Sequence, residues 1–483
     1  MNKISKVLIA NRGEIALRII RACKELEVKS VVVFSEADID GVWVKKADEC
    51  YPIMGNPVQV YLDYDVIISI AKKAGCDAIH PGYGFLSESA EFAAACKDND
   101  MIFIGPKASH IELFGDKMAS KVAMKKVGVP VLEGTDTPVV NKEEGEKIAQ
   151  EIGFPVIIKA AFGGGGRGMR IVKKATDFST LFDAATNESI KYFGKGEVFI
   201  EKYVENPRHI EVQVIADSYG NVVHLGERDC SIQRRHQKVI EIAPSPRLND
   251  AVRQELYKIS TEAMLKLGYE SVGTVEFLLD EDDNIYFIEM NTRVQVEHPV
   301  TEVISGVDII QRMIEIADGD RLKYKQEEIN FRGYAIEFRI NSEDPQNNFM
   351  PCAGTITNYL TPGGPGVRID SSMYEGYALP TNYDSMMGKL IVWALDWEGA
   401  VKKAKRALDE YNIDGVKTNI SLHREIVRDV DFKEGNFNTG FLDTKMDTFN
   451  LHAKSSLKDE EEKISFISNM INKIKEHKLT TRS

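Results

Sequence analysis

Residues 274–291 read TVEFLLDEDDNIYFIEMN and predict an antiparallel β-hairpin, because two apolar runs flank a polar turn at residues 281–284. If the turn is centred between positions 282 and 283, Glu276 and Glu289 lie directly opposite each other. Opposed like charges destabilise a hairpin, and a bridging divalent cation removes that cost. Asn291 lies two residues beyond Glu289 on the same face. We therefore predict a metal site on Glu276, Glu289 and Asn291, whose oxygen ligands suit Mg²⁺ or Mn²⁺ rather than zinc.

The same alternation continues beyond the hairpin. Arg293, Gln295 and Glu297 fall on one face of an extended strand, and Val294 and Val296 fall on the other. An arginine, a glutamine and a glutamate that converge beside a metal suit a small planar oxyanion and a general base. We expect a substrate anion to bind there.

A glycine-rich segment lies upstream at residues 163–168, after an apolar run at 156–158. Glycines let backbone N–H groups approach phosphate oxygens without obstruction by a Cβ atom. The spacing is similar to that of a P-loop, but Met169 and Arg170 stand where that motif requires Lys and Ser or Thr. We therefore predict a β-hairpin with a flexible glycine tip over a nucleotide. Lys159 would face the phosphates, and Gly165 and Gly166 belong to the tip.

Two further stretches carry polar side chains. His209, Glu211 and Gln213 alternate with apolar residues, as in a strand. Residues 229–238, DCSIQRRHQK, concentrate cationic and polar donors in an acidic protein, which makes them an anion-site candidate. A single histidine is more often structural, and Cys230 is more typical of a buried small residue than of a nucleophile.

The fold class indicated by the chain as a whole is α/β and α+β. Apolar runs at residues 6–10 and 30–34, with helical spacing between them, predict strand, helix and strand. A helix from Tyr64, a strand at 77–80, a helix from Ser87 and a strand at 101–104 follow. We expect an open α/β domain at 1–114, a second domain at 115–330, a β-rich third domain at 331–446 and a tail at 447–483.

The composition is that of an ordinary globular protein. With 43% apolar and 28% charged residues among 483, the chain is neither disordered nor fibrous. A net charge of −13 disfavours general nucleic-acid binding. The six cysteines are scattered, so neither a disulfide scaffold nor a zinc site is indicated. No apolar run is long enough for a signal peptide or a membrane helix. We expect a cytoplasmic enzyme.

The tail has a pattern of its own. Ser456 followed by Asp459 resembles a capping box, and isoleucines recur at helical spacing at positions 464, 467, 471 and 474. This pattern predicts an amphipathic helix. The helix would pack either on its own protein or against a partner subunit, and the sequence leaves both possibilities open.

Four segments together form a specific combination of motifs: IANRGEIA at 9–16, HPGYGFLSE at 80–88, ERDCSIQRRHQK at 227–238 and EMNTRVQVEH at 289–298. On the basis of these segments, the chain from residue 4 to residue 446 resembles biotin carboxylase, a family of the ATP-grasp superfamily. The resemblance implies a three-domain biotin carboxylase architecture with an ATP-grasp centre and a mobile glycine-rich lid at about residues 131–204.

The resemblance also implies a reaction. Bicarbonate attacks the γ-phosphate of MgATP to give carboxyphosphate, and N1′ of biotin on a carrier protein is then carboxylated. Phosphoryl transfer of this kind depends mostly on positioning and charge neutralisation. A lid that closes over the site excludes water from the labile intermediate.

Individual residues take their expected roles from the same resemblance. Glu297 is the base that deprotonates bicarbonate, Arg293 stabilises the biotin enolate, and Arg339 binds biotin and pairs with the developing charge. The remaining groups are a bicarbonate site (Lys238, Arg293, Gln295, Val296), the metal ligands (Glu276, Glu289, Asn291) and an ATP site (Lys117, Lys159, Gly165, Gly166, Glu201, Lys202, Tyr203, Val204, His209, Gln233, His236, Glu276, Glu289).

Partner chains follow from what the sequence lacks. The string Ala123-Met124-Lys125-Lys126 lies in a helical pattern and is not the Ala-Met-Lys-Met setting of a biotinylated lysine. We therefore expect biotin on another chain, a biotin carboxyl carrier protein or a biotinylated carboxyltransferase subunit, and a homodimer of this chain. Phe162 and the long tail slightly favour the biotin carboxylase subunit of a two-subunit pyruvate carboxylase over that of acetyl-CoA carboxylase.

Three other functions fit these motifs less well. A dehydrogenase is disfavoured because Gly13 alone follows the first strand, so the G-x-G-x-x-G motif fails. Another ATP-grasp carboxylate or carbamate ligase would share the metal hairpin, but it should lack the string from Arg293 to Glu297. A non-catalytic ATP-binding regulator should lose a metal ligand, whereas all three are present.

Overall fold

The N-terminal part of the protein is an open parallel sheet. The fold comes from a computed structural model that describes residues 4–160, 169–193 and 196–451, together with 465, 468 and 470. The strand order is β3-β2-β1-β4-β5, and every pairing is parallel. The helix expected from Ser87 begins at Ala90, because the Ser89 hydroxyl caps it by accepting a hydrogen bond from the Phe92 N–H. The elements are β1 (Lys6–Ile9), α1 (Gly13–Glu25), β2 (Lys29–Phe34), α2 (Val42–Lys46), β3 (Glu49–Pro52), α3 (Tyr64–Ala74), β4 (Ala78–His80), α4 (Ala90–Asp98), β5 (Ile102–Phe103) and α5 (Ala108–Gly115).

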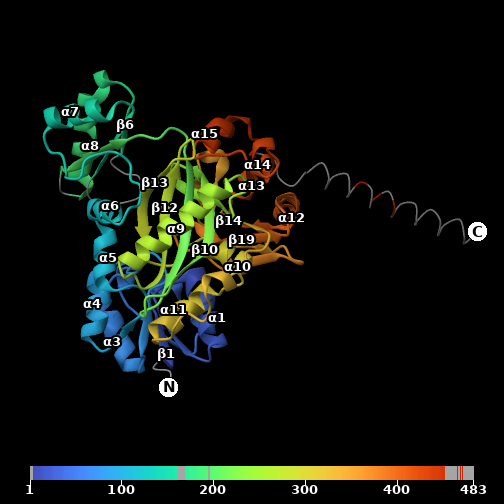
Figure 1. Ribbon diagram of the computed structural model, residues 1–483. Helices are drawn as coiled ribbons and strands as arrows, with labels where there is room; N and C mark the ends of the chain where they lie inside the picture. The colour runs from blue at the N-terminus through green and yellow to red at the C-terminus, as the bar shows by residue number, and fades with distance from the viewer. Residues whose placement is uncertain are drawn as a thin grey trace, which may run out of the picture.

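An antiparallel sheet of eight strands forms the centre of the molecule (Figure 1). Its order is β13-β12-β9-β10-β11-β14-β19-β18. The sheet runs across the boundary expected near residue 330, because β11 pairs with β14 and places Ile240 opposite Phe338. The central and C-terminal segments therefore share one sheet. Its strands are β9 (Arg208–Ala216), β10 (Val222–Arg234), β11 (Gln237–Ala243), β12 (Ser271–Leu279), β13 (Ile285–Asn291), β14 (Tyr334–Asn341), β18 (Val367–Ser371) and β19 (Met386–Ala394).

A smaller sheet of order β7-β6-β8 lies within the segment expected to form the lid. Strands β6 and β7 pair as the predicted glycine-tipped hairpin requires, with Val156 opposite Val172. The unit has a core of its own that includes Ile158 and Phe178, and Figure 1 shows it at one corner of the molecule, beyond β13. Its elements are α7 (Lys142–Ile152), β6 (Val156–Ala160), β7 (Arg170–Val172), α8 (Phe178–Phe193) and β8 (Val198–Lys202), and α6 (Lys117–Lys126) leads into it as predicted.

The C-terminal segment wraps helices and two small sheets around one end of the large sheet. Helix α12 packs on β19, and β15-β16 and β17-β20 form two-stranded sheets. Among the described residues, none of the helices has the length and apolar character needed to cross a bilayer. The elements are β15 (Glu343–Asp344), β16 (Met350–Pro351), β17 (Asn358–Leu360), α12 (Trp397–Glu410), β20 (Asn412–Asp414), α13 (Ile420–Ile426), α14 (Val430–Glu434) and α15 (Phe441–Lys445).

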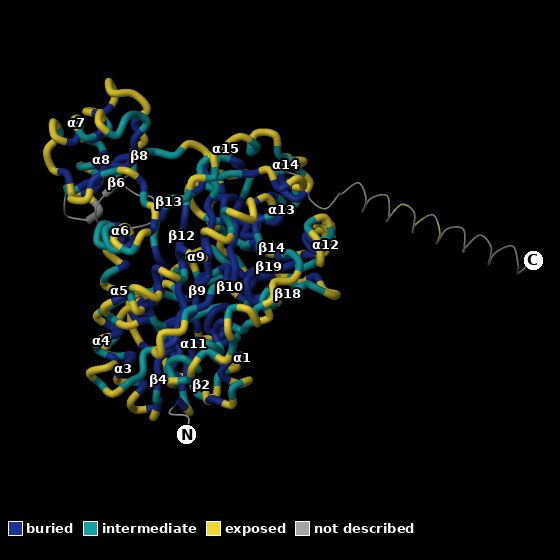
Figure 2. The backbone as a smooth tube through the Cα atoms, in the orientation of Figure 1, coloured by how far each residue is buried: buried dark blue, intermediate teal, exposed yellow. Residues whose placement is uncertain are grey.

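The central strands are buried on both faces, which Figure 2 shows as dark blue strands beneath teal and yellow helices. On β9, Ile210 and Val212 pack into a core with helix α9 (Asp250–Lys266). The alternate residues Glu211 and Gln213 are fully buried on the other face. Helix α10 (His298–Ser305) covers that face, followed in the chain by α11 (Ile309–Ala317). A buried polar layer therefore lies between the large sheet and α10.

Candidate active site

The hairpin at residues 274–291 has the predicted pairing at its functional end. Glu276 lies opposite Glu289 on β12 and β13. A bulge follows, so that Phe277 lies opposite Phe287 and the turn is centred on Asp282 rather than between positions 282 and 283. The physical reason lies in the turn, where a carboxylate oxygen of Asp280 accepts hydrogen bonds from two backbone N–H groups. The bulge restores the register that the two glutamates require.

Glu276 is the buried anchor of the site. Its carboxylate contacts His209 Nε2 at 2.7 Å, Lys238 Nζ at 3.0 Å, Asn291 Nδ2 at 2.8 Å and Gln295 Nε2 at 2.7 Å. Burial alone would raise the pKa of Glu276, but Lys238 and His209 outweigh burial and hold this pKa well below its ordinary value. Glu276 is therefore ionised, with both oxygens engaged.

Glu289 faces a more open environment. Its side chain is 39% exposed, and Oε2 lies 3.9 Å from Nζ of Lys117 at the start of α6. Asn291 joins Glu276 to Arg293, because its amide nitrogen donates to Glu276 at 2.8 Å while its Oδ1 accepts a hydrogen bond from Arg293 at 2.8 Å. Two carboxylates and an amide oxygen fit a hard divalent cation.

Lys238 on β11 contacts three buried acids at once. Its Nζ lies 2.6 Å from Glu211, 3.0 Å from Glu276 and 2.8 Å from Glu297. Although burial favours the neutral amine, these carboxylates raise the pKa of Lys238 well above its ordinary value. Lys238 is therefore charged, and its ammonium group holds the three carboxylates close together.

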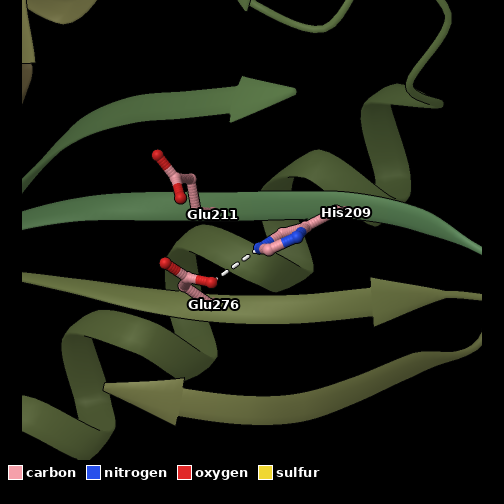
Figure 3. A group of neighbouring side chains, drawn as sticks. All are labelled: His209, Glu211 and Glu276. Atoms are coloured by element: carbon pink, nitrogen blue, oxygen red, sulfur yellow. Dashed lines mark hydrogen bonds and ion pairs between the residues drawn. The ribbon is translucent and has the colours of Figure 1, made fainter. Parts of the chain in front are cut away.

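His209, Glu211 and Glu276 form a compact group of potential ligands (Figure 3). Their ligand atoms lie within 4.8 Å of one another. Gln233 donates its amide N–H to His209 Nδ1 at 2.8 Å, so Nε2 carries the imidazole hydrogen and donates it to Glu276. The role of Glu211 was not predicted from the sequence, although its alternation with His209 was the signal that could have revealed it.

Arg228 is a second buried cation that contacts several side chains of the site, and its role was not predicted from the sequence. It is fully buried on β10 and donates hydrogen bonds to five side chains. Its partners come from β9, β12, α10 and the loop before α10, and this long-range pattern left no local signal. They are Glu211, Gln213, Thr274, Gln295 and Thr301.

Glu297 lies between two cations. Lys238 contacts Oε1 at 2.8 Å, and Arg339 Nη2 donates to Oε2 at 2.9 Å. Burial would raise the pKa of Glu297, but Lys238 and Arg339 outweigh burial and lower this pKa. Arg339 on β14 also donates from Nε to Glu241. Glu297 is therefore an ionised carboxylate that can accept a proton.

The prediction that a strand continues through Arg293, Gln295 and Glu297 was wrong. Strand β13 ends at Asn291, and the chain then turns into α10, which has Pro299 at its start. Proline fixes its own φ and restricts the residue before it, so it suits this helix start. Gln295 and Glu297 are nevertheless buried in the site.

Two residues of this loop have partners outside the polar layer. Arg293 Nε donates to Glu88 at 2.9 Å, which joins the loop to the N-terminal part. The Val296 carbonyl accepts a hydrogen bond from Lys389 Nζ at 2.8 Å. Arg293 and the carbonyl of Val296, both predicted to bind bicarbonate, are therefore each bound to another residue of the protein.

The predicted nucleotide side of the site centres on Glu201. Its two oxygens contact Lys121 at 3.0 Å and Lys159 at 2.7 Å, and these lysines lower the pKa of Glu201 against the effect of burial. Lys121 was not predicted. Lys202 donates to the Gly153 carbonyl at 2.8 Å. Two further residues of the predicted ATP site, Tyr203 and Val204, directly follow β8 and are half-buried. A third, His236, is exposed in the turn between β10 and β11.

Three predictions lie outside the described residues. The glycine tip, including Gly165 and Gly166, falls in the segment 161–168. So does Phe162, which favoured a pyruvate carboxylase. The isoleucines of the predicted tail helix also lie outside the described part of the chain.

The small three-stranded sheet, which carries Lys159, lies apart from the large antiparallel sheet, which carries Glu276 and Glu289. Family models match nearly the whole chain. They are "Biotin carboxylase, N-terminal domain" at residues 3–111, "Carbamoyl-phosphate synthase L chain, ATP binding domain" at 116–325 and "Biotin carboxylase C-terminal domain" at 337–444.

Curated relatives agree with these matches. The 2-oxoglutarate carboxylase small subunit of Hydrogenobacter thermophilus is 50% identical over 466 residues, which is 96% of this chain and 98% of that relative. A pyruvate carboxylase subunit of Methanothermobacter thermautotrophicus is 50% identical over 95% of this chain and 94% of its own. Biotin carboxylase of Pseudomonas aeruginosa is 50% identical over 92% of this chain and 99% of its own.

A solved structure has the same fold. The biotin carboxylase domain dimer of the Hydrogenobacter thermophilus 2-oxoglutarate carboxylase, in complex with MgADP, ADP and bicarbonate, superposes with a TM-score of 0.90 at 51% identity, covering 92% of this chain and 99% of that one. This chain belongs to the biotin carboxylase family. It is an ATP-dependent ligase that carboxylates biotin, and ATP, a divalent metal and bicarbonate are what such an enzyme uses.

Proposed function

We propose that Lys238, Arg339 and Glu297 form the centre at which bicarbonate is bound and deprotonated. The observation that carries this proposal is the pair of ion contacts on Glu297, one from each cation. A bicarbonate anion that binds Lys238 and Arg339 competes with Glu297 for the same positive charge. As the anion takes over these contacts, the affinity of Glu297 for a proton rises, so the ionised carboxylate becomes an effective base.

The remaining polar side chains of the layer are proposed to orient the anion. Gln295 is held by Glu276 and Arg228, which fixes the direction of its amide. Arg293 and Val296 complete the bicarbonate site, and Arg293 exchanges Glu88 for the substrate. Arg339, fixed by Glu241 on one side, is proposed to bind the ureido group of biotin and the charge that develops there.

The nucleotide is proposed to lie between the large sheet and the small lid sheet. Lys117, Lys159 and His209 contact its phosphates or ribose, together with Gln233 and the glycines Gly165 and Gly166. The base would be held by the segment Glu201, Lys202, Tyr203 and Val204, with His236 toward the ribose. Support comes from the lysines on Glu201, which bring cationic side chains to the face of the lid sheet near α6.

A divalent cation, Mg²⁺ or Mn²⁺, is proposed to be held by Glu276, Glu289 and Asn291, whose oxygens suit it. When bound, the ion supplies positive charge that neutralises the phosphate oxygens during phosphoryl transfer. The protein contributes a fixed Glu276 and a more exposed Glu289, so one ligand is positioned before the ion arrives.

The parent enzyme is proposed to be a two-subunit carboxylase of a 2-oxo acid, with pyruvate as the first candidate acceptor. The two relatives with such names match 96% and 95% of this chain, whereas the Pseudomonas biotin carboxylase matches 92%. The partner would be a biotin carboxyl carrier protein or a biotinylated carboxyltransferase subunit, and this chain would form a homodimer, as in the solved dimer. Carboxylation of pyruvate, 2-oxoglutarate or acetyl-CoA by the co-purified complex identifies the acceptor.

The proposed base is tested by ATP hydrolysis with Mg²⁺, with and without bicarbonate and free biotin. We expect bicarbonate-stimulated hydrolysis, raised by biotin, in the wild-type protein. Glu297→Gln should reduce it by about 100-fold or more, the usual scale for loss of a general base. Glu398→Gln, on the exposed face of α12, is the matched control and should have wild-type activity. Wild-type turnover in Glu297→Gln would rule out this residue as the base.

A further inference from the structure

A buried pair of acids lies behind Arg339. Glu241 on β11 and Glu337 on β14 are directly opposite in the antiparallel register, so both side chains project from the same face. Both are fully buried. Arg339 donates to Glu241 from Nε at 2.5 Å and to Glu297 from Nη2 at 2.9 Å. The guanidinium therefore joins the acid pair to the proposed base.

The two acids differ in their hydrogen bonds. Neither carboxyl oxygen of Glu337 has a hydrogen-bond partner among the described residues. Glu241 has one bound oxygen, because its Oε1 accepts from Arg339, while its Oε2 has no partner in the same part of the chain. A buried carboxylate without a partner is far more costly than a buried neutral acid, and a second carboxylate opposite adds repulsion. One neutral acid and one carboxylate is therefore the favoured state of the pair.

The surrounding charges assign the proton to Glu337. Burial, helped by repulsion from Glu241 and opposed by Lys389, raises the pKa of Glu337 well above its ordinary value. Burial also raises the pKa of Glu241, to about 7, although Arg339 opposes the shift. The acid that Arg339 touches is therefore the one that ionises first, and the pair carries its single charge, on Glu241, once the pH exceeds about 7.

Other charged groups near the pair are already engaged. Lys389 on β19 contacts Glu14 and the Val296 carbonyl, and Lys238 contacts three other acids. The buried thiol of Cys230 on β10 also interacts with Glu241, but burial raises the pKa of Cys230 well above its ordinary value and keeps this thiol neutral. Three further titratable groups on the packed elements have partners elsewhere: Asp370 on β18 with Arg368, Glu302 on α10 with Arg18 and Arg368, and His298 on α10 with the Gln295 carbonyl.

We propose that Glu241 and Glu337 hold one proton between them, on Glu337, and that the single charge left on Glu241 positions Arg339 against Glu297. Glu241 is a positioning residue, because it acts on substrate through Arg339. A second negative charge behind Arg339 would draw the guanidinium away from the substrate, and no charge would leave its orientation unfixed. The inference rests on the proposed roles of Arg339 and Glu297.

The proton on Glu337 is tested by thermal unfolding of the full chain between about pH 7.5 and pH 9, above the pKa of Glu241. Above the ordinary pKa of a glutamic acid, about 4.3, the unfolded chain releases the proton that the folded chain keeps. The contribution of Glu337 to the stability of the wild-type protein therefore falls as pH rises. The equilibrium constant for unfolding increases by up to about tenfold per pH unit from this cause. Glu337→Gln has no such proton, so its Tm relative to wild type should rise steadily with pH.

The exposed control Glu398→Gln should give a Tm difference that does not change with pH. A pH-independent difference for Glu337→Gln would show that Glu337 is ionised in the folded protein and would overturn the proposal. A difference that falls with pH would overturn it as well. The Tm can be measured without catalytic activity, so failure of this prediction can be distinguished from failure of the proposed function.

The positioning role of Glu241 is tested by kinetics with free biotin at about pH 8, where Glu241 is ionised. Glu241→Gln should lower kcat/KM for biotin by about tenfold, the usual cost of losing a residue that orients a functional group, while KM for ATP stays within about twofold. Glu337→Gln should keep kcat/KM for biotin within about twofold, because its side chain is already neutral. Equal losses in both variants, or no loss in either, would overturn the role. Absence of any bicarbonate response in wild type would instead reject the proposed function.

Discussion

At the scale of single residues, the site is organised by buried cations that each serve several acids. Lys238 contacts three carboxylates from three different segments, and Arg228 ties five polar side chains together. Removing one member of such a network leaves buried charges uncompensated, which costs more than an exposed ion pair is worth. The charges that prepare the site for anions therefore also hold its strands together.

Lys238→Gln should consequently affect both stability and activity. The substitution leaves Glu211, Glu276 and Glu297 without their shared cation, and we expect a loss of about 3 kcal/mol or more in the free energy of unfolding. Bicarbonate-stimulated ATP hydrolysis should also be lost. Urea unfolding at pH 7 measures the first effect. Lys402→Gln, which removes an exposed partner of Glu398 on α12, should cost less than about 1 kcal/mol. Similar costs for the two variants would contradict this account.

At the scale of elements, local patterns predicted the strands well and the connections poorly. The two strands of the hairpin followed from alternation, which is a local property, but Glu276 lies opposite Glu289 only because a bulge offsets a turn centred one half-residue from the predicted position. The bulge beside Glu276 depends on side-chain hydrogen bonds of Asp280 within the turn, which alternation does not describe. The loop from Arg293 to Glu297 also alternates polar and apolar residues, but it bends to begin α10 and was wrongly predicted as strand.

Site residues divided in the same way. Those in motifs with regular spacing, such as His209, Glu276 and Glu297, were predicted and lie together in the structure. Arg228 and Lys121 were missed, because their partners are distant in the sequence. Long-range ion pairs leave no periodic signal, so only the folded structure reveals them.

The β18–β19 edge offers a test of pH dependence at this scale. Asp370 on β18 is buried and paired with Arg368 at 2.6 Å, and although burial opposes it, Arg368 lowers the pKa of Asp370 to about 2. A lowered pKa contributes stability that is present above the ordinary pKa of about 4 and is lost as pH falls toward 2. The Asp370→Asn variant should therefore be less stable than wild type by about 2 kcal/mol at pH 5 to 7.

This difference should shrink as the pH is lowered from about 4. Urea midpoints at pH 7, 5, 4 and 3 measure it. Asp65→Asn, at an exposed position of α3, is the control and should give a small, nearly constant difference. A difference between wild type and Asp370→Asn that grew on acidification would show that the Asp370 pKa is raised rather than lowered.

At the scale of the whole molecule, three parts of the chain meet at Lys389. Its side chain is completely buried on β19, its Nζ lies 3.1 Å from Glu14 on α1, and it donates to the Val296 carbonyl at 2.8 Å. Glu14 in turn accepts a hydrogen bond from Tyr83. One ammonium thus connects helix α1 of the N-terminal part, the large antiparallel sheet and the loop that carries the proposed bicarbonate site.

Because Lys389 has two separate tasks, its removal should have two separable effects. Lys389→Met leaves Glu14 buried without its cation, which should cost about 3 kcal/mol or more, and it frees the Val296 carbonyl from its anchor. We expect KM for bicarbonate to rise by about tenfold or more with little change in KM for ATP.

Adding Glu14→Gln removes the uncompensated charge, so the double variant should regain most of the lost stability. It should not regain the bicarbonate KM, because nothing then holds the Val296 carbonyl. Urea unfolding and steady-state kinetics on the same preparations measure the two properties. Recovery of both the stability and the bicarbonate KM in the double variant would mean that Lys389 affects the loop only through overall stability.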